Sequence, residues 1–442
     1  MKKSAVMTFA SLASAAALAA VPRVDENEVT ISQDASRAVT VTYTLTEAAG
    51  IVTVDFQTNC VTEAGETWAS IGAENFQNLA GDVNCIVTEL DVAKTITWRP
   101  DISWGGHKIK DGVRAVVKAW ALDDPPEYMA INLGVDDAVF FYPCAAAVPG
   151  GVTSDIYKTD WLLMRKIPAA NVIWRMGSPL GENGKDYDDS NNYRETPHLV
   201  MLTENYYMAV YETTQQQHNR ILKSGNAYVG DGKLPKGTIC WDDIRGNGAK
   251  GKDYEWPKKK GVNPSSVMGQ LRSRWPRVPS FDLPTEARWE YACRAGCGSA
   301  LYNGTELSGT KGTTAVNEVG VVGWCKGLVD APQIVGQKEA NSWGLYDTIG
   351  NLEEWCLDWW AQQDTTGVEI LVPGKIYVDP LGPPEDLLGV RACRGGNITS
   401  NTANDRCAAR SQRSQSTSKN VNIGYRICCD AKIVLPEPEQ AE

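Results

Sequence analysis

The residues best suited to chemistry gather in one polar segment near the C-terminus. Of the 26 residues from Asn397 to Asn422, 13 are Asn, Ser or Thr. Short polar side chains form adaptable hydrogen-bonding surfaces, as they do in antibody loops. The segment therefore predicts a ligand-binding surface, and no residue of the chain is assigned a catalytic role. The residues expected to contact the ligand are Asn397, Thr399, Ser400, Asn401, Thr402, Asn404, Asp405, Arg413 and Asn420.

The same region is strongly basic within an acidic chain. Between Arg391 and Arg426 one acidic residue, Asp405, stands against seven basic ones: Arg391, Arg394, Arg406, Arg410, Arg413, Lys419 and Arg426. Two interpretations stay open: a local face that attracts anions, or a solvated loop whose arginines pair internally. The net charge of −11 argues against general nucleic-acid binding, which needs a basic surface across a whole domain. No nucleic-acid partner is expected.

Cysteine and histidine spacing indicates no zinc site. Cys293 and Cys297 are separated by three residues and Cys428 and Cys429 are adjacent, so no CxxC pair faces a second one at ligand spacing. The three histidines are scattered through the chain and are expected to be ordinary surface or core residues. Twelve cysteines in an exported chain would instead suggest disulfides, most of which spacing cannot pair.

The N-terminus predicts export. Lys2 and Lys3 precede a weakly apolar run from Ala5 to Ala20 with small residues at Ala17 and Ala19, which is typical of a signal peptide over residues 1–20. A buried helix or a membrane anchor is the alternative, but the run is shorter than the ~20 residues that span a bilayer. We expect a protein that does not span the membrane and is periplasmic, displayed at the cell surface or secreted.

Residues 25–140 alternate apolar and polar side chains in the manner of β-strands. The predicted strands are Val39–Leu45, Ile51–Phe56, Thr95–Trp98 and Val113–Trp120. Clusters of Gly, Asn, Asp and Pro separate them, as short antiparallel strands in a sandwich require. The segment predicts an immunoglobulin-like or fibronectin-like β-sandwich, interpreted as a spacer or adhesion domain, in which Cys60 and Cys85 could be joined.

A change of composition marks the next boundary. Pro143, Pro149, Gly150 and Gly151 interrupt the pattern and predict a linker over residues 141–155. A second domain is expected over residues 156–430, followed by a flexible tail over residues 431–442.

Three motifs in the second domain carry a family resemblance. They are Leu283-Pro-Thr-Glu-Ala-Arg-Trp-Glu-Tyr-Ala-Cys293, Gly344-Leu-Tyr-Asp-Thr-Ile-Gly-Asn-Leu-Glu-Glu-Trp355 and Asn422-Ile-Gly-Tyr-Arg426. In this order and spacing they resemble the sulfatase-modifying-factor family, whose best-known members are formylglycine-generating enzymes. The resemblance implies an α+β fold: the β-sandwich followed by a C-type-lectin-like domain with little regular secondary structure.

Local physics agrees with these motifs. Thr285 can cap a helix that buries Trp289 and Ala292 on one face, with Glu286 in its first turn. Loops in such a fold must be held down, and ion pairs are the expected means. The residues expected to form them are Glu354, Asp358, Arg394, Arg410 and Arg426.

The resemblance also implies calcium. In the family, one site uses the position of Asp347 with nearby main-chain carbonyls, which corresponds here to Asp347, Thr348, Gly350 and Leu352. A hard cation prefers such oxygen ligands. A second family site corresponds to Asn317 and Glu318. The alternative for Asp347 and Asn317 is turn capping without metal.

Copper is not expected, because this sequence departs from the family where copper(I) binds. Aerobic formylglycine-generating enzymes use two cysteines after an Arg-Gly-Gly, but after Arg394-Gly-Gly396 the first cysteine position holds Ser400 and the segment is shortened at the second. A hydroxyl does not replace a thiolate for copper(I). Asn397 also stands where the family has Ser, and Glu353 where it has Trp. Cys393 could offer a substitute thiol, without an evident partner.

The resemblance assigns a structural role to the remaining cysteine of that loop. Cys407 aligns with a residue that many family members join in a disulfide to the counterpart of Cys293. Such a cross-link would stabilise the fold by about 3 kcal/mol, by restricting the unfolded chain.

The C-terminal segment is also similar to the variable proteins of diversity-generating retroelements, which share the C-type-lectin fold. Those proteins place randomised contact residues in a C-terminal segment, and mutation at adenines of Asn codons leaves Asn, Ser, Thr, Asp and Ile, as found from Asn397 to Asp405.

Three functions follow from the sequence. The favoured one is an exported binding protein whose lectin-like domain contacts an unidentified protein or glycan. The alternative is a formylglycine-generating-type oxidase or another metal-dependent protein-modifying enzyme, and whether the chain is an enzyme stays open. A third is a structural surface protein without a specific ligand.

Overall fold

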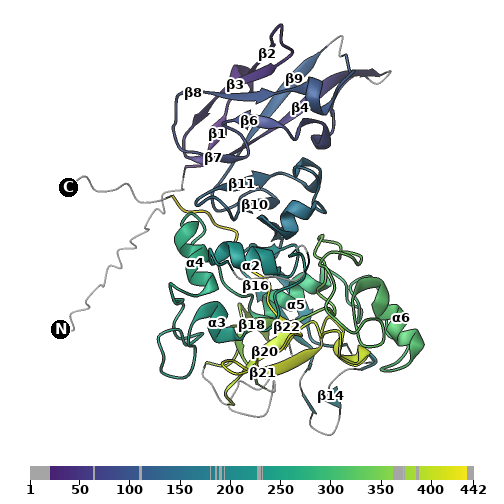
Figure 1. The fold of residues 1–442 in the computed structure, drawn as a ribbon. Helices are drawn as coiled ribbons and strands as arrows, with labels where there is room; N and C mark the ends of the chain where they lie inside the picture. The colour runs from purple at the N-terminus through teal and green to yellow at the C-terminus, as the bar shows by residue number, and fades with distance from the viewer. Residues whose placement is uncertain are drawn as a thin grey trace, which may run out of the picture.

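The computed structural model describes residues 20–62, 65–108, 112–179, 181–184, 187–188, 192–193, 195–225, 230, 232–361, 372, 374–384 and 388–435. The fold is mixed α+β, with many short strands and few, short helices (Figure 1). A pair of sheets from the N-terminal third of the chain lies at one end, and the remainder forms a larger body at the other (Figure 1). The predicted signal peptide lies outside the described residues except for Ala20.

The N-terminal part contains two antiparallel sheets. One has the strand order β1-β3-β8-β6 with β2 paired to β3, and the other has the order β5-β4-β7 with β9 paired to β4. The elements are β1 (Arg23–Val24), η1 (Glu26–Glu28), β2 (Thr30–Gln33), β3 (Val39–Thr46), β4 (Gly50–Thr62), β5 (Gly65–Ser70), η2 (Ala73–Phe76), β6 (Leu79–Gly81), β7 (Cys85–Val87), β8 (Ala93–Trp98), α1 (Pro100–Ser103) and β9 (Val113–Trp120).

The two sheets share one apolar core, as strict alternation of side chains predicts. Every second residue of β3 from Val39 to Leu45 is buried, and these side chains pack with Val54 and Phe56 of β4 and Trp98 of β8. All four predicted strands are therefore present. The side chain of Cys60 lies outside the described part of the structure, so the proposed link to Cys85 stays a prediction.

The N-terminal sandwich is shorter than predicted. Strands β10 (Tyr128–Asn132) and β11 (Val139–Tyr142) pair with each other, and β10 pairs with β12 (Trp161–Ile167), which places residues 128–142 in the C-terminal sheet. The predicted linker is packed rather than extended. It includes the 3-10 helices η3 (Ala145–Ala147) and the start of η4 (Asp155–Lys158), and Val148 is fully buried. Apolar, strand-forming residues continue across the true boundary, in Tyr128–Asn132 and Val139–Tyr142, so composition alone misplaced it.

The C-terminal part contains a five-stranded sheet of order β11-β10-β12-β17-β23 and a four-stranded sheet of order β21-β20-β18-β22, with smaller sheets β13-β16-β19 and β14-β15. Its remaining strands are β13 (Val172–Met176), β14 (Tyr187–Asp188), β15 (Asn192–Tyr193), β16 (His198–Leu202), β17 (Tyr206–Ala209), β18 (Glu353–Trp359), β19 (Ile376–Val378), β20 (Val390–Arg394), β21 (Arg410–Ser414), β22 (Ile423–Gly424) and β23 (Cys428–Asp430). Its helices are α2 (Gln215–Ile221), α3 (Trp241–Arg245), α4 (Val267–Arg274), α5 (Glu286–Arg294), α6 (Thr313–Val322) and η5 (Thr402–Asn404).

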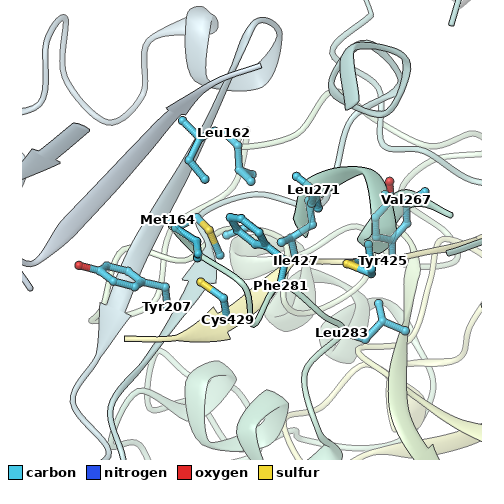
Figure 2. Close-up of a cluster of buried hydrophobic side chains, with 14 of the residues drawn as sticks. Leu162, Met164, Tyr207, Val267, Leu271, Phe281, Leu283, Tyr425, Ile427 and Cys429 are labelled. Atoms are coloured by element: carbon cyan, nitrogen blue, oxygen red, sulfur yellow. The ribbon is translucent and has the colours of Figure 1, made fainter. Parts of the chain in front are cut away.

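The core of this part joins segments that are far apart in sequence. Figure 2 shows Leu162 and Met164 of β12 packed with Tyr207 of β17, Leu271 of α4 and Ile427. Because each helix is short, its stability comes from this burial rather than from its own hydrogen bonds. The sheet edge and the loops that carry the polar segment are built on this core.

The family motifs adopt the local structures expected of them. Thr285 Oγ1 accepts a hydrogen bond from the Arg288 amide at 3.2 Å and caps α5, whose Trp289 and Ala292 are buried. Thr214 caps α2 in a reciprocal capping box with Gln217. These caps hold the helices that line the base of the polar segment.

The C-terminus of the described chain returns to the N-terminal sheets. Ala431 and Ile433 are buried, and the Ile433 amide donates to the Leu122 carbonyl at 2.7 Å. The predicted tail therefore does not begin at residue 431, because Ala431 and Ile433 belong to the apolar core between the two parts. None of the helices described in the structure is long and apolar enough to cross a bilayer.

Candidate functional site

The first half of the polar segment, residues 397–409, lies in the connection of one β-hairpin. Arg394 at the end of β20 lies opposite Arg410 at the start of β21, so residues 395–409 form the connecting loop. Gly396 begins it with φ +70°, and a Cβ atom there would lie 2.0 Å from Asp405 Oδ1. The turn therefore requires glycine at this position.

Side chains within the loop define its shape. Asn397 Oδ1 accepts hydrogen bonds from the Thr399 amide at 2.9 Å and the Thr399 hydroxyl at 2.7 Å. The Asn397 amide donates to Ser400 Oγ at 3.0 Å. Asn and Ser form such turns because their short side chains replace backbone partners. Much of the polar composition therefore serves the loop's own conformation.

The nine predicted contact residues divide by burial. Those at the surface are Thr399, Asn401, Asn404 and Asn420, with Ser400 and Arg413 half-buried. Asn397, Thr402 and Asp405 are buried, with at most 5% of their area exposed. The structure thus offers six of the nine to a ligand, and the other three shape the loop from inside.

The basic residues of this region have internal partners, which favours the second interpretation, a loop whose arginines pair internally. Arg394 Nε lies 2.7 Å from Glu286 and its Nη1 2.9 Å from Glu290, while Arg406 Nη2 lies 2.9 Å from Glu195. Arg391 binds Gln415 and main-chain carbonyls, and Arg410 binds Glu286. Arg413 pairs with Glu353, Lys419 with Asp243 and Arg426 with Glu354. These pairs hold both ends of the loop rigidly.

A polar cavity of about 280 Å³ opens beside the hairpin. Its lining includes Glu353 from β18, Ser400 and Asn404 from the loop, and Ser411 and Arg413 from β21. Glu353 is 2% exposed; one carboxylate oxygen accepts from the Ser411 hydroxyl and the other lies 2.9 Å from Arg413 Nε. Burial raises the pKa of Glu353, and the Arg413 charge opposes that rise.

The cavity contains one thiol among its lining residues. Cys393 reaches it, but this residue is fully buried and burial raises the pKa of its thiol well above the ordinary value. A thiol held in its protonated form is a poor ligand and a poor nucleophile. Neighbouring Cys356, also buried, has a raised pKa for the same reason.

Cys293 and Cys407 are brought together beneath the loop. A hydrogen bond from Cys293, together with burial, raises the pKa of Cys407 well above its usual range. The structure carries them as two thiols inside an apolar cluster, away from the cavity lining. The contact agrees with the expected pairing, and the covalent bond stays a prediction.

Asp405 is a buried carboxyl group with few stabilising contacts. Neither of its oxygens has a hydrogen-bond partner within the described chain, although the nearby Asn397 amide opposes the pKa rise that burial causes. Glu353 raises that pKa further by repulsion. Burial and repulsion from Glu353 thus favour the neutral, protonated form of Asp405 over its carboxylate.

The expected first calcium position contains an unpaired oxygen. Asp347 has φ +55°, its Oδ2 accepts from the Gly336 amide at 2.6 Å, and its Oδ1 has no partner although it is buried. Burial, together with the nearby Glu354 carboxylate, raises the pKa of Asp347 to about 6. Glu212 is a third buried carboxylate here, with its pKa raised by burial and by Asp347. These features fit a bound cation.

The side chains alone do not make a metal cage. Within the described ranges, no group of three or more His, Cys, Asp or Glu side chains could hold a metal ion. A cation at Asp347 would rest mainly on the main-chain oxygens of Thr348, Gly350 and Leu352, as the family resemblance implies. Those oxygens belong to the turn that Gly350 makes with φ +72°.

The expected second calcium position has a different setting. Asn317 and Glu318 lie within helix α6, and the Glu318 carboxylate accepts from the Ser308 amide at 2.9 Å. Main-chain carbonyls inside a helix are occupied by its own hydrogen bonds, so they are not free for a cation. The described structure of α6 therefore adds no support for a calcium site at Asn317 and Glu318.

A second cavity, of about 570 Å³, shares Arg410 with the polar one. Its walls are mostly apolar residues of the segment 375–384, and its floor includes His198 and Asp358. Asp358 accepts a hydrogen bond from the Glu286 amide at 2.7 Å, and burial raises its pKa to about 7. The Asp358 carboxyl therefore caps the N-terminus of α5. The polar groups at the floor of this cavity stabilise the fold.

Sequence reasoning missed part of the polar cavity. Ser411 and Gln412 line it, and Glu353 was noted only as a departure from the family's tryptophan. A carboxylate in place of a large aromatic was the available signal, because such a change exchanges an apolar wall for a charge. Ser411 carried no signal, since its position depends on the register of β21 against β20.

Comparisons with known proteins agree with the motifs. The sulfatase-modifying factor enzyme 1-like domain matches residues 175–431. Formylglycine-generating enzyme of Mus musculus is 32% identical over 312 residues, covering 61% of this chain and 76% of that protein. That of Bos taurus is 26% identical over 323 residues, covering 64% of this chain and 78% of that protein.

Among solved structures, Treponema denticola variable protein 1 is similar at 22% identity, with a TM-score of 0.42, over 61% of this chain and 95% of that one. The family match spans more than half of the chain, and it covers both the hairpin and the polar cavity. The chain belongs to the sulfatase-modifying factor family.

Proposed function

We propose that this protein is an exported, ligand-binding member of the family, in which the loop after Arg394 contacts a protein or a glycan. The observation that carries the proposal is the combination of exposed Thr399, Asn401 and Asn404 with a base of buried ion pairs. A rigid base with adaptable polar side chains on top is the arrangement that recognition surfaces use.

The chemistry of the cavity supports binding over oxidation. Ser400 stands where the family's first copper-binding cysteine is expected, and Cys393 is the thiol that reaches the described lining. Copper(I) prefers two or more soft thiolate ligands, and a buried thiol with a raised pKa supplies that poorly. Fold membership by itself does not decide activity, since function depends on the site.

The experiment is a screen of the purified full chain against protein and glycan arrays. We expect one or a few ligands for the wild type and loss of binding in the Asn401→Ala, Asn404→Ala double variant. Thr30→Ala, a change at an exposed residue of β2, is the control and keeps binding. Binding that is equal in the double variant and the wild type would contradict the proposal.

A second candidate is an oxidase or another protein-modifying enzyme, favoured by the activity named for the two relatives. Incubation of the protein with copper(I), oxygen and a cysteine-containing peptide from a sulfatase separates the two. Turnover by the wild type would support the enzyme. Absence of turnover, in the presence of array binding, supports the binding protein.

Active diversification of the segment 397–422 is a further part of the proposal. Its support is the run of Asn, Ser, Thr, Asp and Ile from Asn397 to Asp405. The test is genomic. A near-copy of this coding segment beside a reverse-transcriptase gene supports diversification, and its absence contradicts it.

We also propose that the N-terminal sheets form an immunoglobulin-like spacer on an exported chain. The apolar alternation of β3 and the basic-apolar leader over residues 1–20 support this. Mass measurement of the protein recovered from the envelope or medium tests the export. We expect a mature N-terminus close to Ala19, and an intact Met1 would contradict it.

Calcium at Asp347 completes the proposal. The unpaired Asp347 Oδ1, buried beside Glu212 and Glu354, supports a stabilising cation there. Bound calcium would supply positive charge and hold the turn that precedes β18. Its expected effect is on stability of the fold.

A further inference from the structure

The polar cavity contains an unequal ion pair. Glu353 at the start of β18 is 2% exposed, whereas its partner Arg413 on β21 is 39% exposed. β20 lies between these two strands in the sheet, so the glutamate reaches across it to Ser411 and Arg413, which share one face of β21. The anion belongs to the protein interior, and the cation is partly in water.

The other arginines of this sheet are held quite differently. Arg394 and Arg410 have at most 5% of their side chains exposed, and each binds Glu286 together with further acceptors. Their charges are neutralised within the core. Among the described residues, Arg413 has one carboxylate partner, Glu353, and it donates a hydrogen bond to the adjacent Gln412 carbonyl. Because the Arg413 side chain is 39% exposed, it can turn into water when another cation takes its place beside Glu353.

Glu353, by contrast, cannot be left alone. A buried carboxylate without a partner carries a large desolvation penalty, so the position needs a cation at all times. Glu353 needs a cation beside it, and its own partner Arg413 is partly exposed to water. The site is therefore suited to exchange of Arg413 for a cation from a ligand.

The cavity limits what can enter. A volume of about 280 Å³ lies just under the usual range for small-molecule pockets and suits a single side chain. The rim offers Ser400, Asn404 and Gln412, whose hydroxyl and amide oxygens can accept hydrogen bonds from a multivalent donor. A guanidinium is planar and presents five donors, which match a carboxylate in two parallel hydrogen bonds.

We propose that Glu353 is the specificity-determining residue of the cavity and binds an arginine side chain of a protein ligand, in place of Arg413, which occupies the site in the free protein. The inference rests on the proposed binding function and deepens it. Of the two ligand classes considered above, it selects protein over glycan, because glycans lack guanidinium groups.

The direct test is calorimetric titration of the full chain with N-acetyl-arginine amide and, as matched control, N-acetyl-citrulline amide, which is isosteric and uncharged. We expect the arginine probe to bind about tenfold more tightly than the citrulline probe, as one partly desolvated charge-assisted contact implies. Equal affinity for the two probes would overturn the inference.

Two substitutions sharpen the result. Arg413→Gln removes the internal competitor and is expected to strengthen arginine binding by about tenfold. Glu353→Gln is expected to abolish the preference for arginine over citrulline. Lys419→Gln, which removes one positive charge from a half-exposed lysine paired with Asp243, is the matched control and leaves both affinities unchanged.

Folding is checked before affinities are compared. Arg413→Gln leaves Glu353 without a cation and is expected to melt below the wild type, so circular dichroism must first show that the variant is folded. An unchanged arginine affinity in that folded variant counts against the exchange. If array ligands bind and depend on Asn401 and Asn404 but ignore Glu353→Gln, the inference fails and the proposed function stands. If no array ligand depends on Asn401 and Asn404, the proposed function fails, whatever the probes do.

Discussion

The two parts of this molecule are stabilised in different ways. In the N-terminal sheets, the core consists of apolar side chains such as Val41, Phe56 and Ile96, and no described charged side chain before residue 128 is buried. In the C-terminal part, arginines such as Arg394, Arg406 and Arg426 are buried against carboxylates. The N-terminal part is stabilised by alternating apolar side chains, and the C-terminal part by buried pairs of opposite charge.

The difference concerns how each part tolerates change. Apolar packing is distributed over many weak contacts, so one altered residue has a limited effect. A buried ion pair concentrates its energy in one partner, because removal of that partner leaves the other charge desolvated. The polar loop needs a base of the second kind, since irregular chain contains few repeating hydrogen bonds to hold it.

The largest expected effect comes from breaking one buried pair. Arg426 Nη2 lies 2.6 Å from Glu354 Oε1 and both side chains are buried. We expect Arg426→Met to lower the free energy of unfolding by about 3–5 kcal/mol, measured by urea denaturation. The double variant Arg426→Met, Glu354→Gln should recover part of the loss, because no uncompensated charge remains. A double variant as unstable as the single one would show that geometry, and not charge, dominates here.

Calcium is expected to have the next largest effect. At a free concentration about 100 times its dissociation constant, a bound cation stabilises by about 2.7 kcal/mol. We expect the wild type to melt higher with calcium than with chelator, and Asp347→Asn to lose most of that difference. An identical melting profile of the wild type in both conditions rejects the metal assignment at Asp347.

The pH dependence of stability tests the buried acid beneath Arg410. Burial raises the pKa of Asp358 from 3.8 to about 7, so the folded state holds a proton that the unfolded state has lost between those values. Its contribution is complete below about pH 4 and is lost as pH rises towards 7. Between pH 5 and 8 we expect the wild type to lose about 1–2 kcal/mol more than Asp358→Asn. Parallel pH profiles would contradict a protonated Asp358.

A conservative change in the apolar core should have a smaller effect. Ile96 is fully buried in the N-terminal core. Removal of one methyl group in Ile96→Val is expected to cost about 1 kcal/mol, by lost burial and a small cavity. If its cost in urea denaturation matched that of Arg426→Met, the contrast between the two parts would not hold.

The smallest effect is expected at the tip of the loop. Asn401 and Asn404 are exposed. Their replacement by alanine is expected to change the free energy of unfolding by less than about 0.5 kcal/mol, since exposed positions away from caps and cores rarely contribute more. A strong loss of stability would assign these residues to the scaffold and remove them from the recognition surface.

Much of the fold was predictable from local patterns. The strands Val39–Leu45 and Val113–Trp120 follow from alternation, and the Thr285 cap follows from helix chemistry. The sandwich boundary was misplaced, because Tyr128–Asn132 is a further apolar strand that pairs with β12 and not with the N-terminal sheets. Alternation identifies a strand but not the neighbour it pairs with.

The candidate site was predictable only in part. Composition pointed to the segment after Arg394, and six of its nine proposed contact residues reach the surface. Whether the basic residues would attract anions or pair internally was open, because their partners Glu182, Glu195 and Glu286 lie more than 100 positions away in the chain. A count of charges within one segment of the sequence does not include such distant partners.

The amino-acid sequence by itself determined the family, several local elements such as β3, β9 and α5, and the polar character of the loop, because these depend on residues near one another along the chain. Only the tertiary structure decided which charges meet, which asparagines are buried and that Glu353 lies opposite Arg413. Electrostatic energy depends on distance in space and on burial, and both are set by long-range packing of strands that the local pattern does not order.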